Sequence, residues 1–159
     1  MIPENVQKAL QLHGLEALEF EEGSTPTSEL AAQKLGVATG QIAKSILMKG
    51  KDEIFRMILC AGDRKISTSQ LKKLIGVKAR MATAEEVYES TGFRPGGVSP
   101  FGVTGIDILI DESLAEYETV YPSAGNDASG VPVTYDRLLE ITGNRKCAVT
   151  VPIISDSEE

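Results

Sequence analysis

The sequence has little of the chemistry on which most hydrolases and metalloenzymes depend. Its 159 residues include one histidine, two cysteines and no tryptophan. Cys60 and Cys147 lie far apart and form no C-x-x-C pair, so neither a disulfide framework nor a zinc site is predicted. With His13 as the only histidine, a Ser-His-Asp triad is not expected, and a structural role is assigned to His13. We therefore expect no metal and no cofactor.

Long apolar runs are also missing. No stretch approaches the length that crosses a bilayer, and the opening MIPENVQKAL lacks the charged-then-apolar pattern of a secretory signal. We expect a cytoplasmic protein with no membrane contact. A hydrophobic content of 42% with 25% charged residues is ordinary for a globular chain. The sequence predicts one domain over residues 1–152, followed by an acidic, disordered tail over residues 153–159.

Positive charge is scarce overall but concentrated in one window. The net charge of −7 argues against a domain that coats nucleic acid through its total charge. Between Lys44 and Arg80, however, ten basic residues stand against three acidic ones. Two readings remain open: a patch that grips a few phosphates, or a solvated surface with uneven charge.

The order of predicted elements indicates an α+β fold. Residues 41–62 read as two strands joined by a polar turn at 49–52, and a last strand is expected within residues 146–154. Ser67 and Thr83 each begin a capping box before a helix. Further predicted elements are helices at 4–13, 27–36 and near 135–143, and strands near 15–20, 105–113, 118–125 and 131–134. We expect a curved, mixed, barrel-like β-sheet with surrounding helices.

A loop rich in glycine and proline interrupts this pattern. Residues 93–102 read FRPGGVSPFG, in which proline fixes the backbone and glycine permits positive φ and close approach. One interpretation is a plain connection between two elements. The other is that Gly96, Gly97 and Gly102 expose N–H groups to a ligand's carbonyl or phosphate oxygen.

Lys44 occupies an unusual place in the predicted strand IAKSILM. Alternation puts it on the same face as Ile42, Ile46 and Met48. A lysine on an apolar stripe either extends its amine to the edge of the sheet or projects into a ligand cavity.

Together these motifs resemble a known family. A lysine in I-x-K-S-I-L, then GDRKIS before a helix, STGFRPGGVSPFG, and YPSAGN before a last strand and helix are similar to the YbaK and prolyl-tRNA-synthetase-associated editing domains. The resemblance runs from about residue 4 to residue 150. It implies a free-standing aminoacyl-tRNA deacylase that hydrolyses mischarged tRNA carrying a small amino acid, such as alanine, cysteine, serine or threonine.

The resemblance also assigns roles to residues. It matches the family's strand lysine to Lys44 and its loop to residues 96–102, which leads us to expect a catalytic set of Lys44, Gly97, Val98 and Ser99. Two departures are visible, a segment NDASGVPV after the last turn and a phenylalanine at position 20, where some members have tyrosine. The residues expected to bind the aminoacyl group are Phe20, Ile46, Gly96, Pro100, Gly102, Ser123, Ala124 and Gly125. Those expected to contact tRNA are Lys49, Lys51, Arg64, Lys65, Lys72 and Lys73.

The chemistry is compatible with a site that lacks an obvious nucleophile. An aminoacyl ester is already activated, so fixing the ester, a water and the neighbouring ribose hydroxyl in line is enough for hydrolysis. Backbone N–H groups between Gly97 and Ser99 are expected to stabilise the oxyanion, with Lys44 supplying charge and placement. Two alternatives stay open: a module that binds an aminoacyl or nucleotide end without cleaving it, and a regulatory domain that docks on an aminoacyl-tRNA synthetase.

Overall fold

The fold is built around one mixed β-sheet in which β2 is the longest strand. The structure is a computed structural model and describes residues 1–153, so the predicted tail lies outside the described residues except for Ile153. The main sheet contains β2 (Ile42–Gly50), β3 (Phe55–Ala61), β5 (Ala79–Met81), β6 (Asp107–Asp111), β7 (Thr119–Pro122), β9 (Val133–Thr134) and β10 (Lys146–Cys147). Two short pairs flank it: β1 (Leu18–Glu19) with β8 (Ser129–Gly130), and β4 (Arg64–Ile66) with β11 (Thr150–Pro152).

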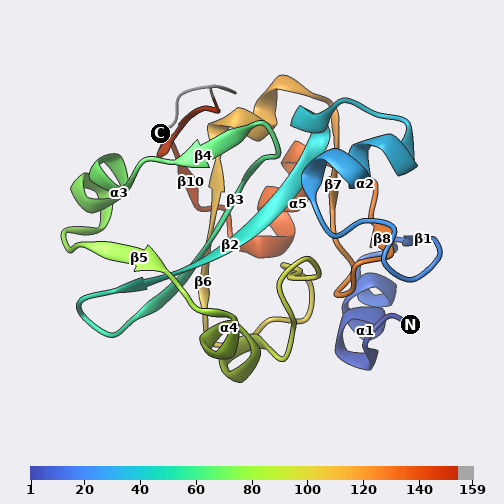
Figure 1. Cartoon of the computed structure of the whole chain (residues 1–159), viewed down its shortest axis with the longest axis horizontal. Coiled ribbons are helices and arrows are strands. Elements are labelled where there is room, and N and C mark those ends of the chain that lie inside the picture. The colour runs from blue at the N-terminus through green and yellow to red at the C-terminus, as the bar shows by residue number, and fades with distance from the viewer. Residues whose placement is uncertain (154–159) are drawn as a thin grey trace.

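Strand order places β2 in the interior of the main sheet. The order is β10-β6-β3-β2-β7-β9, and β5 also pairs with β2. β2 runs antiparallel to β3 and parallel to β7. Figure 1 shows β2 crossing the molecule diagonally, with α2 beside one end and β5 beside the other. Because β7 and β5 share one edge of β2 at opposite ends, the middle of that edge is left to other segments.

Within residues 1–153, five α-helices surround the sheet, and most begin and end where the sequence predicts. They are α1 (Glu4–Leu12), α2 (Ser28–Leu35), α3 (Thr68–Ile75), α4 (Ala84–Thr91) and α5 (Tyr135–Thr142), with 3-10 turns η1 (Thr39–Gln41) and η2 (Glu112–Glu116). Thr27 caps α2 by accepting a hydrogen bond from the Leu30 N–H, and Thr83 and Glu86 form the predicted capping box of α4. Left-handed glycines at 36, 76, 92 and 143 end the last four helices.

The two faces of β2 contact different clusters of apolar side chains. Ala43 and Leu47 belong to the main core, which also contains Leu59, Phe101 and Val120. Met48, on the other face, packs beneath α3 in a second cluster with Ile58 and Leu71. This division fixes which side chains of β2 point into the core and which point toward α2 and α3.

A buried carboxylate fastens the end of the chain to the sheet. Asp111 is fully buried and accepts hydrogen bonds from the Val149 N–H at 2.8 Å, the Thr150 hydroxyl at 2.7 Å and the Ser113 N–H at 3.1 Å. With its oxygens satisfied in this way, Asp111 has a structural role.

The predicted α+β fold with a curved mixed sheet is confirmed, while the prediction of a single last strand is wrong. The short strand predicted near Phe20 is β1, and just beyond it the Phe20 N–H donates to the Ala128 carbonyl at 2.8 Å. The expected last strand is divided into β10 and β11, which pair with different partners, β6 and β4. On α2, Ala31 and Ala32 are buried, whereas Leu30 is 44% exposed. Across residues 1–153, none of the helices has the length and apolar character needed to span a bilayer.

Candidate functional site

A cavity of about 220 Å³ lies where the first half of β2 meets α2 and two loops. The strand contributes Lys44 and Ser45, and the glycine-proline loop contributes Gly96 and Val98. The turn after β7 contributes Ser123. The remaining lining residues are Thr25, Pro26, Thr27, Ser28, Ala31, Leu35, Ile42, Ala43, Tyr121 and Ser129. The cavity therefore brings together the strand lysine, the loop and the later turn that the sequence singles out.

Lys44 is the only charged residue among those that line this cavity. It is half-buried, and its Nζ donates a hydrogen bond of 3.4 Å to the Gly62 carbonyl. Gly62 is held closely, because a Cβ at that position would lie 2.5 Å from the Thr39 carbonyl oxygen and 2.7 Å from the Ser28 Cβ. The bond leaves the remaining ammonium protons of Lys44 for a ligand.

The edge of β2 is open beside this cavity. On that edge β7 pairs with Ile42 and Ala43, and β5 pairs with the stretch from Met48 to Gly50. The Leu47 carbonyl accepts from the Ala82 N–H at 2.9 Å, which shows that Leu47 directs its main-chain groups away from β3. By strand alternation, Ser45 directs its main-chain N–H and C=O to the same side, into the gap between β7 and β5.

The glycine-proline loop is fixed by packing against two other segments. Gly96 has φ +91°, and a Cβ there would lie 3.2 Å from the Pro26 carbonyl oxygen. A Cβ on Gly97 would lie only 2.7 Å from Asn126 Cα, so this glycine is needed for the loop to touch the turn after β7. The loop's shape is thus set by contacts on both sides of the cavity.

One of the loop's predicted donors and two of its acceptors are already used within the protein. The Gly97 N–H donates to the Arg94 carbonyl at 2.9 Å, which corrects the expectation that it is free for a ligand. The hydroxyl of the fully buried Ser99 accepts from the Phe101 N–H at 3.1 Å. Gly102 packs against α1, where Asn5 Nδ2 donates to its carbonyl at 3.2 Å. Pro100 is buried and, like Gly97, Ser99 and Gly102, is not among the cavity's lining residues.

The other predicted binding residues are divided in the same way. Ser123 lines the cavity, whereas Ala124 is fully buried in the main core and Gly125 packs against Pro3 and Phe93. Ile46 packs with the cluster beneath α3, and Phe20 lies under Lys34, with 5.8 Å from Nζ to the ring centre. Neither Phe20 nor Ile46 is among the lining residues.

The contribution of α2 and of Ser45 to the cavity was not predicted from the sequence. Thr27, Ser28, Ala31 and Leu35 come from the start and inner face of α2, where they serve as cap and core residues and carry no motif. Ser45 sits beside Lys44 in a strand that reads as ordinary. Alternation assigned Ser45 to the opposite face, so only the open edge of the sheet reveals that it also lines the cavity.

A second, larger hollow of about 600 Å³ lies at the far end of β2. We call it the basic groove; it runs between the tip of the β2–β3 hairpin, β5 and the start of α3. Its lining residues are Lys49, Gly50, Lys51, Glu53, Thr68, Ser69, Lys72, Lys78, Ala79 and Arg80. Five of these side chains are cationic and one is acidic, which favours an anionic ligand.

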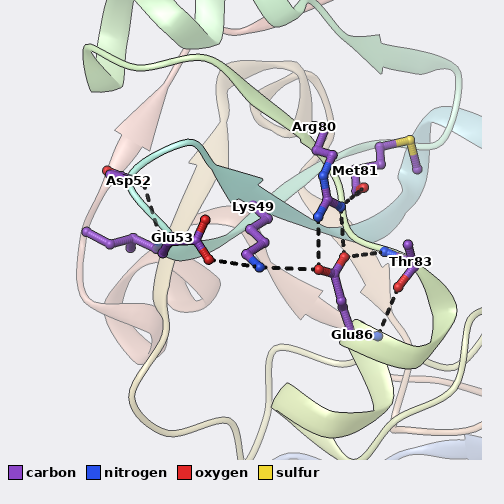
Figure 2. A network of polar contacts seen from close by, with 8 residues as sticks. Lys49, Asp52, Glu53, Arg80, Met81, Thr83 and Glu86 are labelled. Atoms are coloured by element: carbon purple, nitrogen blue, oxygen red, sulfur yellow. Dashed lines mark hydrogen bonds and ion pairs between the residues drawn. The ribbon is translucent and has the colours of Figure 1, made fainter.

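Two cations of the basic groove are held in an ion-pair network (Figure 2). The Arg80 guanidinium donates to both carboxylate oxygens of Glu86 at 2.8 and 2.9 Å. Lys49 Nζ lies 3.4 Å from Oε2 of the same carboxylate and 3.2 Å from Oε1 of Glu53. The Thr83 N–H adds a hydrogen bond of 2.9 Å to Glu86. Arg80 and then Thr83 hold the pKa of Glu86 far below its ordinary value. The exposed Lys51, Lys72 and Lys78 form no ion pair within residues 1–153.

Three of the six predicted tRNA contacts line the basic groove. Lys49, Lys51 and Lys72 line the basic groove, together with Lys78 and Arg80, which were not predicted. Lys73 follows Lys72 on α3 but is not a lining residue of the groove. Arg64 donates from Nη2 to the Thr150 carbonyl at 2.9 Å, and Lys65 pairs with Val151 in the β4–β11 ribbon. Arg64 and Lys65 are not among the lining residues of the groove.

The thiols are unsuited to nucleophilic catalysis. Burial raises the pKa of Cys60 to about 12 and that of Cys147 to about 12. A buried thiol with such a pKa stays protonated at neutral pH and packs as a small apolar group. Within residues 1–153, no cluster of three or more histidine, cysteine or acidic side chains is arranged to hold a metal ion.

The chain is similar to known proteins in both sequence and structure. The model of the aminoacyl-tRNA editing domain family matches residues 22–141. An uncharacterized protein of Bacillus subtilis (strain 168), YwhH, is 38% identical over 122 residues, which cover 76% of this chain and 78% of YwhH. A proline–tRNA ligase of Thermosipho melanesiensis is 34% identical over 89 residues, or 55% of this chain and 16% of the ligase.

A solved structure extends the similarity over nearly the whole chain. The crystal structure of a candidate trans-editing enzyme for prolyl-tRNA synthetase superimposes with a TM-score of 0.85 and 31% identity. The match covers 95% of this chain and 99% of that one.

Proposed function

The chain belongs to the aminoacyl-tRNA editing domain family, and on this basis we propose that it is a trans-acting aminoacyl-tRNA deacylase. It hydrolyses the ester of mischarged tRNA and so contributes to translation quality control. The observation that carries this proposal is the single cavity lined by Lys44, Val98 and Ser123, which come from a strand, a loop and a turn far apart in the sequence. The similarity to a candidate trans-editing enzyme gives independent support.

The cavity supplies binding and placement for the reaction. A water oxygen adds to the ester carbonyl carbon, and the resulting oxyanion is stabilised by a main-chain donor of the loop, for which Val98 is the residue at the cavity wall. The bond between the carbonyl carbon and the ribose oxygen then breaks. The ribose oxygen takes up a proton and leaves as the hydroxyl of free tRNA, and the amino acid is released.

Lys44 acts on the nucleotide side of the ester. Its Nζ is partly engaged by the Gly62 carbonyl, so its position is fixed while donors remain for a phosphate or ribose oxygen. Lys44 forms no covalent bond in this mechanism. The side chain provides a localised positive charge that places the terminal nucleotide, and its contribution belongs to substrate placement.

The size of the cavity favours small aminoacyl groups. A volume of about 220 Å³, shared between the aminoacyl group and the terminal ribose, limits the side chain to one of a few atoms. Alanine, cysteine, serine and threonine are the side chains that we propose. These are mischarged amino acids that a synthetase selects against with difficulty, since one methylene or hydroxyl changes binding only modestly.

The basic groove provides a path for the tRNA backbone. Lys44 and Lys49 are five residues apart on β2, about 17 Å along an extended strand. We propose that the exposed Lys51, Lys72 and Lys78 neutralise phosphates of the acceptor end when the terminal nucleotide lies at Lys44. Lys49 and Arg80 shape the groove, because they are already paired with Glu86.

We also propose an aminoacyl-tRNA synthetase as a partner. The related segment of the proline–tRNA ligase forms part of a synthetase chain. A free-standing domain of this type acts on tRNA after its release, and a weak association with a synthetase would shorten that delay. The proposed reaction places the protein in the cytoplasm, where tRNA is charged.

The proposal is tested by release of amino acid from a panel of correctly charged and mischarged tRNAs. Wild-type protein is compared with Lys44→Ala and with Lys8→Ala, which removes an exposed lysine of α1 remote in the sequence from the cavity residues. We expect turnover of at least one mischarged species, a loss of about 100-fold or more in kcat/KM for Lys44→Ala, and no change for Lys8→Ala.

Three results would contradict the proposal. Full activity of Lys44→Ala would remove Lys44 from the site. No turnover of any charged tRNA, with tRNA binding retained, would favour a binding module that holds the aminoacyl end without cleaving it. Binding of a synthetase with neither turnover nor tRNA affinity would favour the docking domain.

A further inference from the structure

Ser45 carries a polar group that the protein itself does not satisfy. Its Oγ is buried and has no hydrogen-bond partner within residues 1–153, and it is the one side-chain atom there for which both statements hold. Buried hydroxyl groups are almost always paired, because an unpaired one loses its bonds to water without replacement. An unpaired hydroxyl beside a cavity indicates that a ligand supplies the missing partner.

The neighbouring hydroxyls of the cavity differ from Ser45 in this respect. The Thr25 hydroxyl accepts from the Ser129 N–H, and the Ser129 hydroxyl accepts from the Ala124 N–H at 3.1 Å. The Ser123 hydroxyl donates to the Asn126 carbonyl at 2.9 Å. These three hydroxyls stabilise the turn after β7. Ser45 has no such structural task.

The main chain of Ser45 adds a second acceptor at the same place. Its C=O points into the gap between β7 and β5, where no strand within residues 1–153 pairs with it. Ser45, a lining residue of the cavity, thus carries two acceptors that the protein does not use, its carbonyl and its hydroxyl. A small group with two N–H donors matches this pair of acceptors.

We propose that Ser45 binds the α-amino group of the aminoacyl ester through its main-chain carbonyl and its hydroxyl. This inference rests on the proposed deacylase function and names the chemical feature that the site reads: an ester with a free α-amino group. An ester whose amine is acylated, as in peptidyl-tRNA, has one N–H fewer and a bulky substituent where the amine must fit.

Charge separation across the sheet supports this orientation. Lys44 and Ser45 project from opposite faces of β2, although both line the cavity. The lysine cation attracts the phosphates of the terminal nucleotide, whereas the neutral acceptors of Ser45 suit the amine. The lining residues include no carboxylate, so the amine depends on such neutral acceptors. The substrate is therefore held with its anionic end toward Lys44 and its amino group toward Ser45.

The test compares an aminoacyl-tRNA that the wild-type protein deacylates with the same tRNA after chemical N-acetylation. We expect acetylation to lower kcat/KM at least tenfold for the wild type. Ser45→Ala should lower kcat/KM about tenfold for the free amine and change it little for the acetylated ester. Ser45→Thr, which keeps a hydroxyl, should retain most of the activity on the free amine.

Ser90→Ala on α4 serves as the matched control, and thermal melting of each variant checks that it folds. Equal cleavage of the free and acetylated esters by the wild type would overturn the role of Ser45 while leaving the deacylase proposal intact. An equal loss by Ser45→Ala on both esters would also overturn it. If the wild type cleaves no aminoacyl ester, the deacylase proposal fails and the inference fails with it.

Discussion

Lys44 and Ser45 are consecutive residues of β2, yet they face opposite sides of the sheet and still line the same cavity. This relationship is possible because the edge of β2 is open between β7 and β5, so that the cavity reaches past the strand. A single dipeptide thereby offers a cation on one side and neutral acceptors on the other.

The first prediction concerns stability in the absence of substrate. Ser45→Ala should raise the melting temperature by about 2–4 °C, because it removes an unpaired buried hydroxyl whose burial costs about 1 kcal/mol. Calorimetry of the free protein measures this change. A fall of the same size would show that the hydroxyl has a stabilising partner, and the ligand-binding role would lose its basis.

The second prediction concerns tRNA binding by the basic groove. Lys51→Ala, Lys72→Ala and Lys78→Ala should each weaken tRNA binding and make it less sensitive to salt, because each loses about one phosphate contact. Lys73→Ala is the control on the same helix. Binding curves between about 50 and 200 mM salt measure the slopes. If Lys73→Ala behaves like the other three, the backbone does not follow the groove.

The third prediction concerns the contact between the loop and the turn after β7. Gly97→Ala should destabilise the protein by about 1–3 kcal/mol, because the new Cβ would lie 2.7 Å from Asn126 Cα. Gly105→Ala is the comparison: Gly105 has φ +76° but no atom within 4 Å of the added Cβ, so its loss of stability reports backbone strain without a steric clash. Urea denaturation compares the two. Equal and small losses would show that the Gly97 contact yields without cost.

The fourth prediction concerns pH. The folded-state pKa of Glu86 lies below its unfolded value, chiefly because Arg80 binds both carboxylate oxygens. Its stabilising contribution is therefore present above about pH 4.3 and is lost as the pH falls below that value. Glu86→Gln should be less stable than the wild type at pH 7, and the difference should shrink in acid.

Urea denaturation at a series of pH values measures this effect. Glu89→Gln, on the exposed face of the same helix, should leave the profile unchanged. A constant difference between Glu86→Gln and the wild type from pH 7 down to about pH 3 would mean that the ion pair does not account for it.

Local signals in the sequence predicted the elements well where caps and turns are explicit. Thr27, Ser67 and Thr83 each accept a hydrogen bond at the start of a helix, as their side chains predict. The single last strand was wrong because its two parts, β10 and β11, pair with different strands distant in the sequence. Alternation alone does not show where a strand finds its partner.

The site was predicted less completely than the fold. Motifs identified Lys44, Gly96, Val98 and Ser123, all of which line the cavity. They did not separate residues that face the cavity from those that hold the loop in place, such as Gly97 and Ser99, because both kinds share one motif. The residues of α2 and the open edge at Ser45 arise from tertiary packing, which no local pattern encodes.

The open edge of β2 also bears on how the protein avoids aggregation. An exposed strand edge invites pairing with a strand of another molecule. Here β7 and β5 cover both ends of the edge, and Ala82 occupies the Leu47 carbonyl, so the unpaired stretch amounts to little more than the main chain of Ser45. A strand of another molecule pairs stably only through several consecutive main-chain hydrogen bonds. This opening is too short to provide them.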